Sequence, residues 1–268
     1  MKHMQKYTIT LLKKEEVATG TMSFLLSRPE GFVFKAGQHI DLTIPNPPEN
    51  DDEGNVRTFS LASAPEEEGL LVATRMRDTA FKRVLKSMPE GSALEMDGPY
   101  GNMILQSNTS RPAVFLAGGI GITPFRSMIF EAALKGLPHK IFLFYSNRKI
   151  EDAAFLAELR ALEKKNENYK LITTLTAPEA AQSGKSDETG YITEAMVRKY
   201  IPDFLSPVSP RTERAVHNLS TTKGGNPLSG VGVYYLAGPP AMTGAMREML
   251  SRSGVSEDDI RMEEFSGY

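Results

Sequence analysis

The stretch AGGIGITP at residues 117–124 joins an apolar run to a helical pattern and so indicates the class of fold. The run AVFLA at residues 113–117 is typical of a strand that is covered on both faces. Thr123 and Pro124 suit the N-cap and the first position of the helix that we expect over residues 124–135. Glycines let a backbone approach a pyrophosphate closely, and a helix N-terminus attracts anions. We therefore predict a dinucleotide-binding turn, although Pro124 replaces the last glycine of the usual fingerprint and an ordinary tight turn is the alternative.

The C-terminal half continues this alternation of strand and helix. Strand patterns cover residues 140–146, 170–175 and 231–236, and helical patterns cover residues 153–165, 193–200 and 241–253. This order predicts a Rossmann-like parallel sheet with helices on both faces. A second turn, AGPPAM at residues 237–242, falls at the same edge of the sheet, where open α/β sheets bind ligands. The segment 206–230 is rich in Pro, Ser and Gly and has neither a strand nor a helix pattern. We therefore expect an irregular surface loop there, with a partner-binding element as the alternative.

The N-terminal half has the pattern of a small β domain. Short strand patterns with Gly or Pro between them cover residues 7–12, 21–26, 39–44, 58–62, 70–76 and 93–96. One short helix is expected over residues 80–87. Six short strands at this spacing predict a six-stranded antiparallel barrel. We therefore divide the chain into a β-barrel domain at residues 1–108 and an α/β domain at residues 109–268.

Composition excludes several classes of function. The 268 residues carry 31 Lys and Arg against 33 Asp and Glu, a net charge of −2, so no global basic field is available for a nucleic acid. There is no Cys, and the four His are scattered, so the sequence supports no metal site and no Cys-ligated cluster. We see no apolar segment long enough to insert into a membrane and no secretory signal, and we expect a cytoplasmic protein.

The segment RTFS at residues 57–60 places three kinds of ligand-binding side chain on one strand. Its Arg and Phe face one side of the strand, and its Thr and Ser face the other. One ligand can then meet a charge and a ring while a hydroxyl approaches from the neighbouring side, although a half-buried strand with a surface Arg is the alternative. Asp78 or Thr79 can cap the helix over residues 80–87, whose N-terminus is a further place for a phosphate.

These signals, in this order, resemble the ferredoxin–NADP reductase superfamily of flavoenzymes over nearly the whole chain. The matching motifs are FKAGQ at residues 34–38, RTFS at 57–60, GPYG at 98–101, GIGITP at 119–124, GPP at 238–240 and EEFSGY at 263–268. The resemblance implies an N-terminal flavin-binding barrel followed by a C-terminal domain for a nicotinamide nucleotide.

The resemblance also implies roles for single residues. Arg57 would neutralise the flavin pyrophosphate, Phe59 would pack on the isoalloxazine, and Ser60 would hydrogen-bond near flavin N5, the atom that accepts hydride. The chain departs from the family at Phe59, where Tyr is usual, and at Ala237, where many members have Cys. The predicted cofactor-binding residues are Arg57, Thr58, Phe59, Ser60, Arg75, Thr79, Ala80, Phe81, Gly119, Gly121, Thr123, Pro124, Arg148, Gly238, Pro239, Phe265 and Tyr268.

The C-terminal residues are similar to the aromatic tail of the family. Phe265 first, and Tyr268 second, would lie against the flavin and be displaced by nicotinamide. Glu263 or Glu264 would be the active-site carboxylate, and the residues do not decide between them. We name Ser60, Glu264 and Phe265 as the predicted catalytic residues.

The choice of nucleotide depends on the end of the second strand of the α/β domain. Arg148 and Lys149 follow that strand, and two cations suit the 2′-phosphate of NADP. Asp152 lies nearby in the sequence, so NAD remains the alternative nucleotide, because NAD enzymes usually hold the ribose 2′-hydroxyl with an acid. The alternative is that both cations only face solvent.

We therefore expect an oxidoreductase that contains FAD and uses NADP(H) or NAD(H) as substrate. FAD is favoured over FMN because Arg57 and the helix start at Thr79 offer two places for a pyrophosphate. Reduced flavin would pass single electrons to a separate protein, such as ferredoxin, flavodoxin or an oxygenase component, because a chain without Cys holds no iron–sulfur cluster of its own. The alternatives are a reductase of free flavin and a non-catalytic binding module that keeps the fold.

Overall fold

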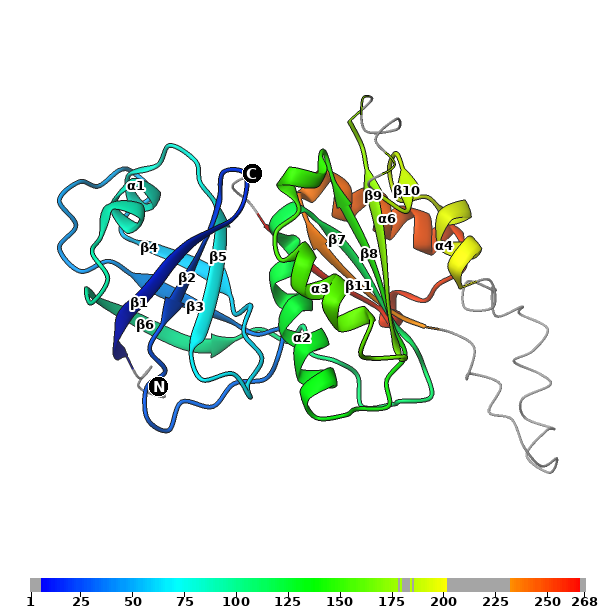
Figure 1. Ribbon diagram of the computed structural model, residues 1–268, viewed down its shortest axis with the longest axis horizontal. Helices are drawn as coiled ribbons and strands as arrows, with labels where there is room; N and C mark the ends of the chain where they lie inside the picture. The colour runs from blue at the N-terminus through cyan, green and yellow to red at the C-terminus, as the bar shows by residue number, and fades with distance from the viewer. Residues whose placement is uncertain (1–5, 178, 180–183, 185, 202–231, 266–268) are drawn as a thin grey trace.

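The computed structural model describes residues 6–177, 179, 184, 186–201 and 232–265, and these residues form two six-stranded sheets (Figure 1). The expected loop at residues 206–230 and the predicted site residue Tyr268 lie outside the described residues. The strands of the first sheet are β1 (Tyr7–Ala18), β2 (Thr21–Leu26), β3 (His39–Thr43), β4 (Val56–Ser60), β5 (Leu70–Arg75) and β6 (Ala93–Tyr100).

The first sheet is antiparallel and strongly curled, as the sequence predicted. Its order is β4-β3-β6-β1-β2-β5, and the register shifts twice within β1, where bulges increase the twist. The amide of Ala62 donates to the carbonyl of Leu71 at 2.7 Å, which brings the chain after β4 against β5 at the opposite edge. Alternate side chains point into the curl and form a core of their own, to which Phe24 and Leu42 belong.

The second sheet is parallel, and its order is β10-β9-β8-β7-β11-β12. Its strands are β7 (Ala113–Gly118), β8 (Ile141–Asn147), β9 (Tyr169–Leu175), β10 (Glu188–Thr189), β11 (Val233–Gly238) and β12 (Ile260–Glu264). Every residue of β7 and β11 is buried, as expected for strands that are covered on both faces. The predicted fold class is therefore confirmed.

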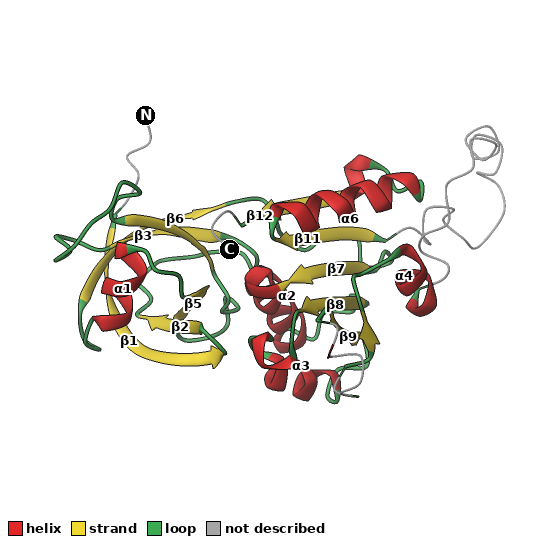
Figure 2. Cartoon of the chain, turned by 90° about the horizontal axis from the view of Figure 1, so that it is seen from above, coloured by secondary structure: helices red, strands yellow, loops and turns green. Residues whose placement is uncertain are grey.

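Helices cover both faces of the parallel sheet (Figure 2). The helices of this domain are α2 (Ile122–Leu134), α3 (Leu156–Glu163), α4 (Glu194–Tyr200) and α6 (Pro240–Arg252). Phe115 of β7 packs in the cluster that includes Met128 of α2 and Leu159 of α3. The preceding residue, Val114, packs on the other face with the cluster that includes Leu250 of α6. The short helix α1 (Ala80–Ser87) belongs to the first domain.

Three details differ from the sequence prediction, and one of them is the two-residue strand β10, which was not predicted. The 3-10 turn η1 (Gly119–Gly121) runs directly into α2, so the helix begins at Ile122 and the expected N-cap at Thr123 was wrong. The strand β12 was not predicted, because its residues IRMEE are mostly charged and are typical of an exposed segment. Such residues are tolerated there because β12 is the edge of the sheet.

The two sheets are joined by a segment and by a buried ion-pair cluster. The segment lies between Tyr100 and Ala113, and the predicted division at 108/109 falls within it. Arg126 of α2 is 4% exposed and reaches across to the first domain, where it donates to the carbonyl of Ala62 at 2.7 Å and to Glu67 Oε2 at 2.9 Å. No helix among the described residues has the length and apolarity that a membrane crossing needs.

Candidate functional site

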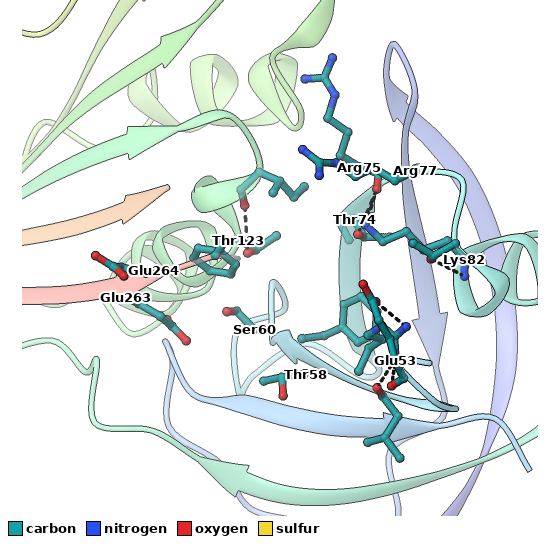
Figure 3. A pocket seen from close by; sticks show the side chains of 17 residues that line it. Glu53, Thr58, Ser60, Thr74, Arg75, Arg77, Lys82, Thr123, Glu263 and Glu264 are labelled. Atoms are coloured by element: carbon teal, nitrogen blue, oxygen red, sulfur yellow. Dashed lines mark hydrogen bonds and ion pairs between the residues drawn. The ribbon is translucent and has the colours of Figure 1, made fainter. Parts of the chain in front are cut away.

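A cavity of about 550 Å³ lies between the curled sheet and one end of the parallel sheet (Figure 3). Its walls come from β4, β5 and the start of α1 on one side and from η1, α2 and β12 on the other. Both domains therefore contribute to one site. This position agrees with the general rule that open α/β sheets bind ligands at the carboxyl ends of their strands.

One wall of the cavity is strongly cationic. It is lined by Arg57 of β4, Arg75 of β5, Arg77 and Lys82. The Lys82 ammonium donates to the carbonyl of Arg75 at 2.8 Å. Burial, followed by the nearby guanidinium groups of Arg77 and Arg57, lowers the pKa of Lys82 to about 8. Four cations in one wall suit a ligand with more than one phosphate.

Arg57 is held over the start of α1. Its guanidinium lies 5.2 Å from the ring centre of Phe81 and donates to the carboxylate of Glu53 at 2.7 Å. Thr79 is the N-cap of α1, and the first helical amide, that of Ala80, donates to Asp51 Oδ2 at 2.8 Å. The Asp51 carboxylate thus contacts both the helix amide and the cation, and it lies between Ala80, which does not line the cavity, and Arg57, which does.

The opposite end of the cavity carries two buried oxygens that have no hydrogen-bond partner among the described residues, Ser60 Oγ and Glu263 Oε2. In Figure 3 the Glu263 carboxylate points toward the Ser60 hydroxyl. Its other oxygen, Oε1, lies 3.4 Å from Nδ1 of His39. Buried polar atoms normally have partners, so two such atoms in one cavity fit a ligand that carries polar groups there.

Glu264 and Phe265 also line this end of the cavity. The Glu264 carboxylate accepts a hydrogen bond from the Thr243 hydroxyl at 3.4 Å and points away from Ser60 in Figure 3. The amide of Phe265 donates to the carbonyl of Gly238 at 3.2 Å, which fixes the backbone just beyond β12. The geometry therefore distinguishes the two acids, because only Glu263 faces the buried hydroxyl.

The two glycine turns pack against each other at the edge of the parallel sheet. A Cβ on Gly121 would lie 2.2 Å from the carbonyl oxygen of Ala237, and a Cβ on Gly118 would lie 2.2 Å from the sulfur of Met242. The absence of side chains is thus needed for contact between the turns, whatever ligand they bind. Thr123 follows the first turn and lines the cavity, and its hydroxyl donates to the carbonyl of Ile120 at 3.1 Å.

Two cations were expected to select between NADP and NAD, namely Arg148 and Lys149. They follow β8 and do not line the cavity. Lys149 pairs with Glu179 at 3.4 Å, and its amide donates to Asp152 at 3.3 Å. Asp152 in turn lies 3.7 Å from Arg75 of the first domain. Arg148 is exposed. This arrangement leaves NAD and NADP undecided, as the sequence did.

About half of the predicted site residues meet in one place. Those that line the cavity are Arg57, Thr58, Phe59, Ser60, Arg75, Thr79, Thr123, Glu264 and Phe265. Those that do not are Ala80, Phe81, Gly119, Gly121, Pro124, Arg148, Gly238 and Pro239. The roles assigned to both groups stay predictions.

Sequence reasoning missed four residues that the geometry adds. Lys82 and Arg77 complete the cationic wall, and His39 and Glu53 contact other site residues. The position of Lys82 in the first turn of α1 was a usable signal, because that turn was already a candidate phosphate site. The contact of His39 depends on pairing between distant segments, so no local pattern gave it.

Family models match both halves of the chain. The Oxidoreductase FAD-binding domain matches residues 8–104, and the Oxidoreductase NAD-binding domain matches residues 115–248, which are half of the chain. Curated relatives include one component of the Na(+)-translocating NADH-quinone reductase from Pseudoalteromonas atlantica, which is 25% identical over 81% of this chain and 50% of that protein. The corresponding component from Methylococcus capsulatus is 25% identical over 98% of this chain and 69% of that protein. The chain thus spans half to about two thirds of the length of these relatives.

Solved structures show the same fold at low identity. The ferredoxin reductase in carbazole 1,9a-dioxygenase has a TM-score of 0.75 and 20% identity, over 98% of this chain and 70% of that one. A ferredoxin NADP+ reductase from Neisseria gonorrhoeae, with bound FAD and NADP, has a TM-score of 0.72 and 20% identity, over 97% of this chain and 98% of that one.

Proposed function

The chain belongs to the ferredoxin–NADP reductase superfamily and has its FAD-binding and NAD-binding domains, and from this we propose that it oxidises NAD(P)H and delivers electrons to a separate acceptor. One observation carries the proposal. A single cavity joins a wall of four cations to two buried, unpartnered oxygens, and both domains line it. A bound flavin supplies the chemistry, because it accepts hydride from a reduced nicotinamide and releases electrons one at a time.

The cavity has groups that suit the pyrophosphate and the redox ring of FAD. Arg57, Lys82 and the start of α1 suit the pyrophosphate, because guanidinium, ammonium and helix amides all bind phosphate oxygens. The Ser60 hydroxyl suits a polar atom of the redox ring, since it is buried and has no partner among the described residues. Phe265 suits the face of that ring, as an apolar cover that excludes water.

We assign proton exchange to Glu263 rather than to the predicted Glu264. Its carboxylate faces Ser60 on one side and His39 on the other. His39 also lines a second, smaller pocket that Glu263 shares with the cavity, so a proton can pass between that pocket and the cavity through Glu263. Glu264 stays the alternative, because it lines the same cavity.

The acceptor is proposed from chemistry and from relatives. No Cys occurs in these 268 residues, so a Cys-ligated cluster that accepts the electrons lies outside them. One named relative belongs to an NADH-quinone reductase and one structural neighbour serves a dioxygenase. We propose an iron–sulfur or flavin protein as the acceptor, with a quinone-linked complex as the second candidate. The cytoplasmic location and the preference for NADP stay predictions.

The first test is the visible spectrum of the purified protein, followed by anaerobic titration with NADPH and, separately, with NADH. We expect a yellow protein that one nucleotide bleaches, and that nucleotide is then the substrate. A colourless protein that oxidises the nucleotide only when free flavin is added would point to a reductase of free flavin. A protein that binds no FAD and oxidises neither nucleotide would overturn the proposal in favour of a binding module.

A further inference from the structure

An acidic loop lies on the phosphate-binding end of the cavity. The loop lies between β3 and β4 and includes Asp51 and Glu53. Asp51 Oδ2 accepts the amide of Ala80 at 2.8 Å, and its Oδ1 lies 3.5 Å from a guanidinium nitrogen of Arg57. Glu53 accepts from the same guanidinium nitrogen at 2.7 Å. The two donors best suited to a phosphate are therefore already bound by carboxylates.

We propose that the Asp51 carboxylate, supported by Glu53, is an internal competitor for the flavin phosphates, so that a phosphorylated flavin binds only by displacing the loop. This inference rests on the proposed placement of the flavin pyrophosphate at Arg57 and α1. It concerns how tightly this chain holds its cofactor and how readily it exchanges it.

The chemistry of the contact supports competition rather than cooperation. A helix amide and a guanidinium form an anion site, and a carboxylate with one oxygen on each donor fills it as a phosphate does. The hydrogen bond from Ala80 is the main cause that holds the pKa of Asp51 below its usual range, so the carboxylate stays charged at neutral pH. A phosphate placed on the same amide would meet that negative charge at contact distance, which is strongly unfavourable.

The loop is held in a way that permits displacement. None of residues 45–58 is buried, so the loop contributes nothing to the core of the curled sheet. Its contacts with the rest of the domain are polar: Glu49 pairs with Arg83 at 2.6 Å, Asp51 accepts from the Ala80 amide, and Glu53 pairs with Arg57. The Arg57 guanidinium also donates to the loop carbonyls of Glu53 and Gly54, both at 2.9 Å. The Glu49–Arg83 pair is exposed on both sides, and such pairs contribute little stability, so it does not hold the loop against a ligand of higher charge.

Competition of this kind depends on the phosphates of the ligand. Riboflavin has no phosphate and does not need the Ala80 amide, so Asp51 leaves its affinity unchanged. FMN and FAD must take that amide and the Arg57 guanidinium away from the loop. The loop therefore lowers the affinity for FAD selectively and favours exchange of the flavin.

The experiment compares Asp51→Ala with Asp52→Ala in flavin-free protein, by fluorescence titration with riboflavin, FMN and FAD at one ionic strength. Asp52 is exposed and has no ion pair among the described residues, so its variant removes the same charge from the same loop. We expect the Kd for FAD to fall at least tenfold in Asp51→Ala and less than twofold in Asp52→Ala. The Kd for riboflavin should change less than twofold in both.

Two results would overturn the inference. One is an unchanged or raised Kd for FAD in Asp51→Ala, which would mean that Asp51 organises the site instead of competing for it. The other is an equal gain in both variants, which would mean a general charge effect. If neither the wild-type protein nor the variants bind any of the three flavins, that result contradicts the proposed function itself. Hydrogen exchange at the Ala80 amide gives a second readout, which should accelerate in ligand-free Asp51→Ala and slow again with FAD.

Discussion

Nδ1 of His39 and Oε1 of Glu263 lie 3.4 Å apart, although His39 belongs to the curled sheet and Glu263 to the parallel sheet. The pair sits where the two domains meet, beside the buried hydroxyl of Ser60. Any group that exchanges protons with a ligand in the cavity must be in contact with both the ligand and the outside. The position of Glu263 suits the proposed exchange, because it lines both the cavity and the smaller pocket.

The first prediction separates the two neighbouring acids. Glu263→Gln should lower the turnover number with NAD(P)H about tenfold or more, since general acid–base groups contribute about that much at least. Glu264→Gln is the matched control and should change it less than about twofold, because that side chain points away from Ser60. Steady-state kinetics with an artificial one-electron acceptor measure both variants. A larger loss in Glu264→Gln would restore the sequence-based assignment.

The second prediction concerns Lys82 and pH. Its pKa of about 8 means that the free protein loses this positive charge as the pH rises through that value. A pyrophosphate binds the charged form better, so the Kd for FAD should rise between about pH 7 and about pH 9. Lys82→Met should bind FAD more weakly at the lower pH and lose this pH dependence.

Lys82→Arg provides the control for that experiment. A guanidinium stays charged throughout this range, so the variant should keep the affinity at both pH values. Equal pH profiles in the wild type and in Lys82→Met would show that another group titrates. The measurement is the same flavin fluorescence titration in buffers of equal ionic strength.

The third prediction tests the junction between the domains. Arg126 is 4% exposed and bonded to Glu67 and Glu158, so Arg126→Ala leaves two acids without their shared partner. Removing one member of a fully buried ion pair costs about 3–5 kcal/mol. Because the two acids are themselves 31% and 36% exposed, we expect the loss in the free energy of unfolding by urea to lie at the lower end of that range. Lys135 is exposed and pairs with Glu66 across the same junction and with Glu131 on its own helix, so Lys135→Ala removes only exposed-side pairs and should cost less than about 1 kcal/mol. If both variants lost the same free energy of unfolding, the burial of Arg126 would not matter for the strength of its ion pairs.

The fourth prediction concerns the contact between the glycine turns. A Cβ on Gly121 would lie 2.2 Å from the Ala237 oxygen, and backbone atoms cannot move aside as a side chain does. Gly121→Ala should therefore lower the free energy of unfolding by about 1–3 kcal/mol or more. Gly244→Ala, in the exposed interior of α6 with nothing within 4 Å of its Cβ, should raise it by about 0.5–1 kcal/mol. If Gly121→Ala left the free energy of unfolding unchanged, the two glycine turns could move apart at little cost.

The fold could be predicted from sequence because its signals are local. The buried run of β7, the glycine turns and the alternation of helices and strands are each contained in a few neighbouring residues. The strand β12 escaped prediction because an edge strand is not required to be apolar, and its charged residues carry no strand pattern.

The candidate site was only partly predictable, for a related reason. RTFS and the cap at Thr79 are local motifs, and both reach the cavity. The contact of Asp51 with Ala80 and the pairing of His39 with Glu263 join distant segments. Such contacts follow from the curl of the first sheet and from the packing of the two domains, which no local pattern specifies.

The placement of the cavity across both domains has a consequence for biosynthesis. The cationic wall comes from β4, β5 and α1, whereas Glu263 and Phe265 belong to the last part of the described chain. A ribosome adding about 5–20 residues per second takes on the order of 10 s or more to pass from α1 to β12. The residues proposed for the flavin phosphates are therefore complete long before the carboxylate and the aromatic cover exist. The two ends of the cavity thus come into existence at separate times in each newly made molecule.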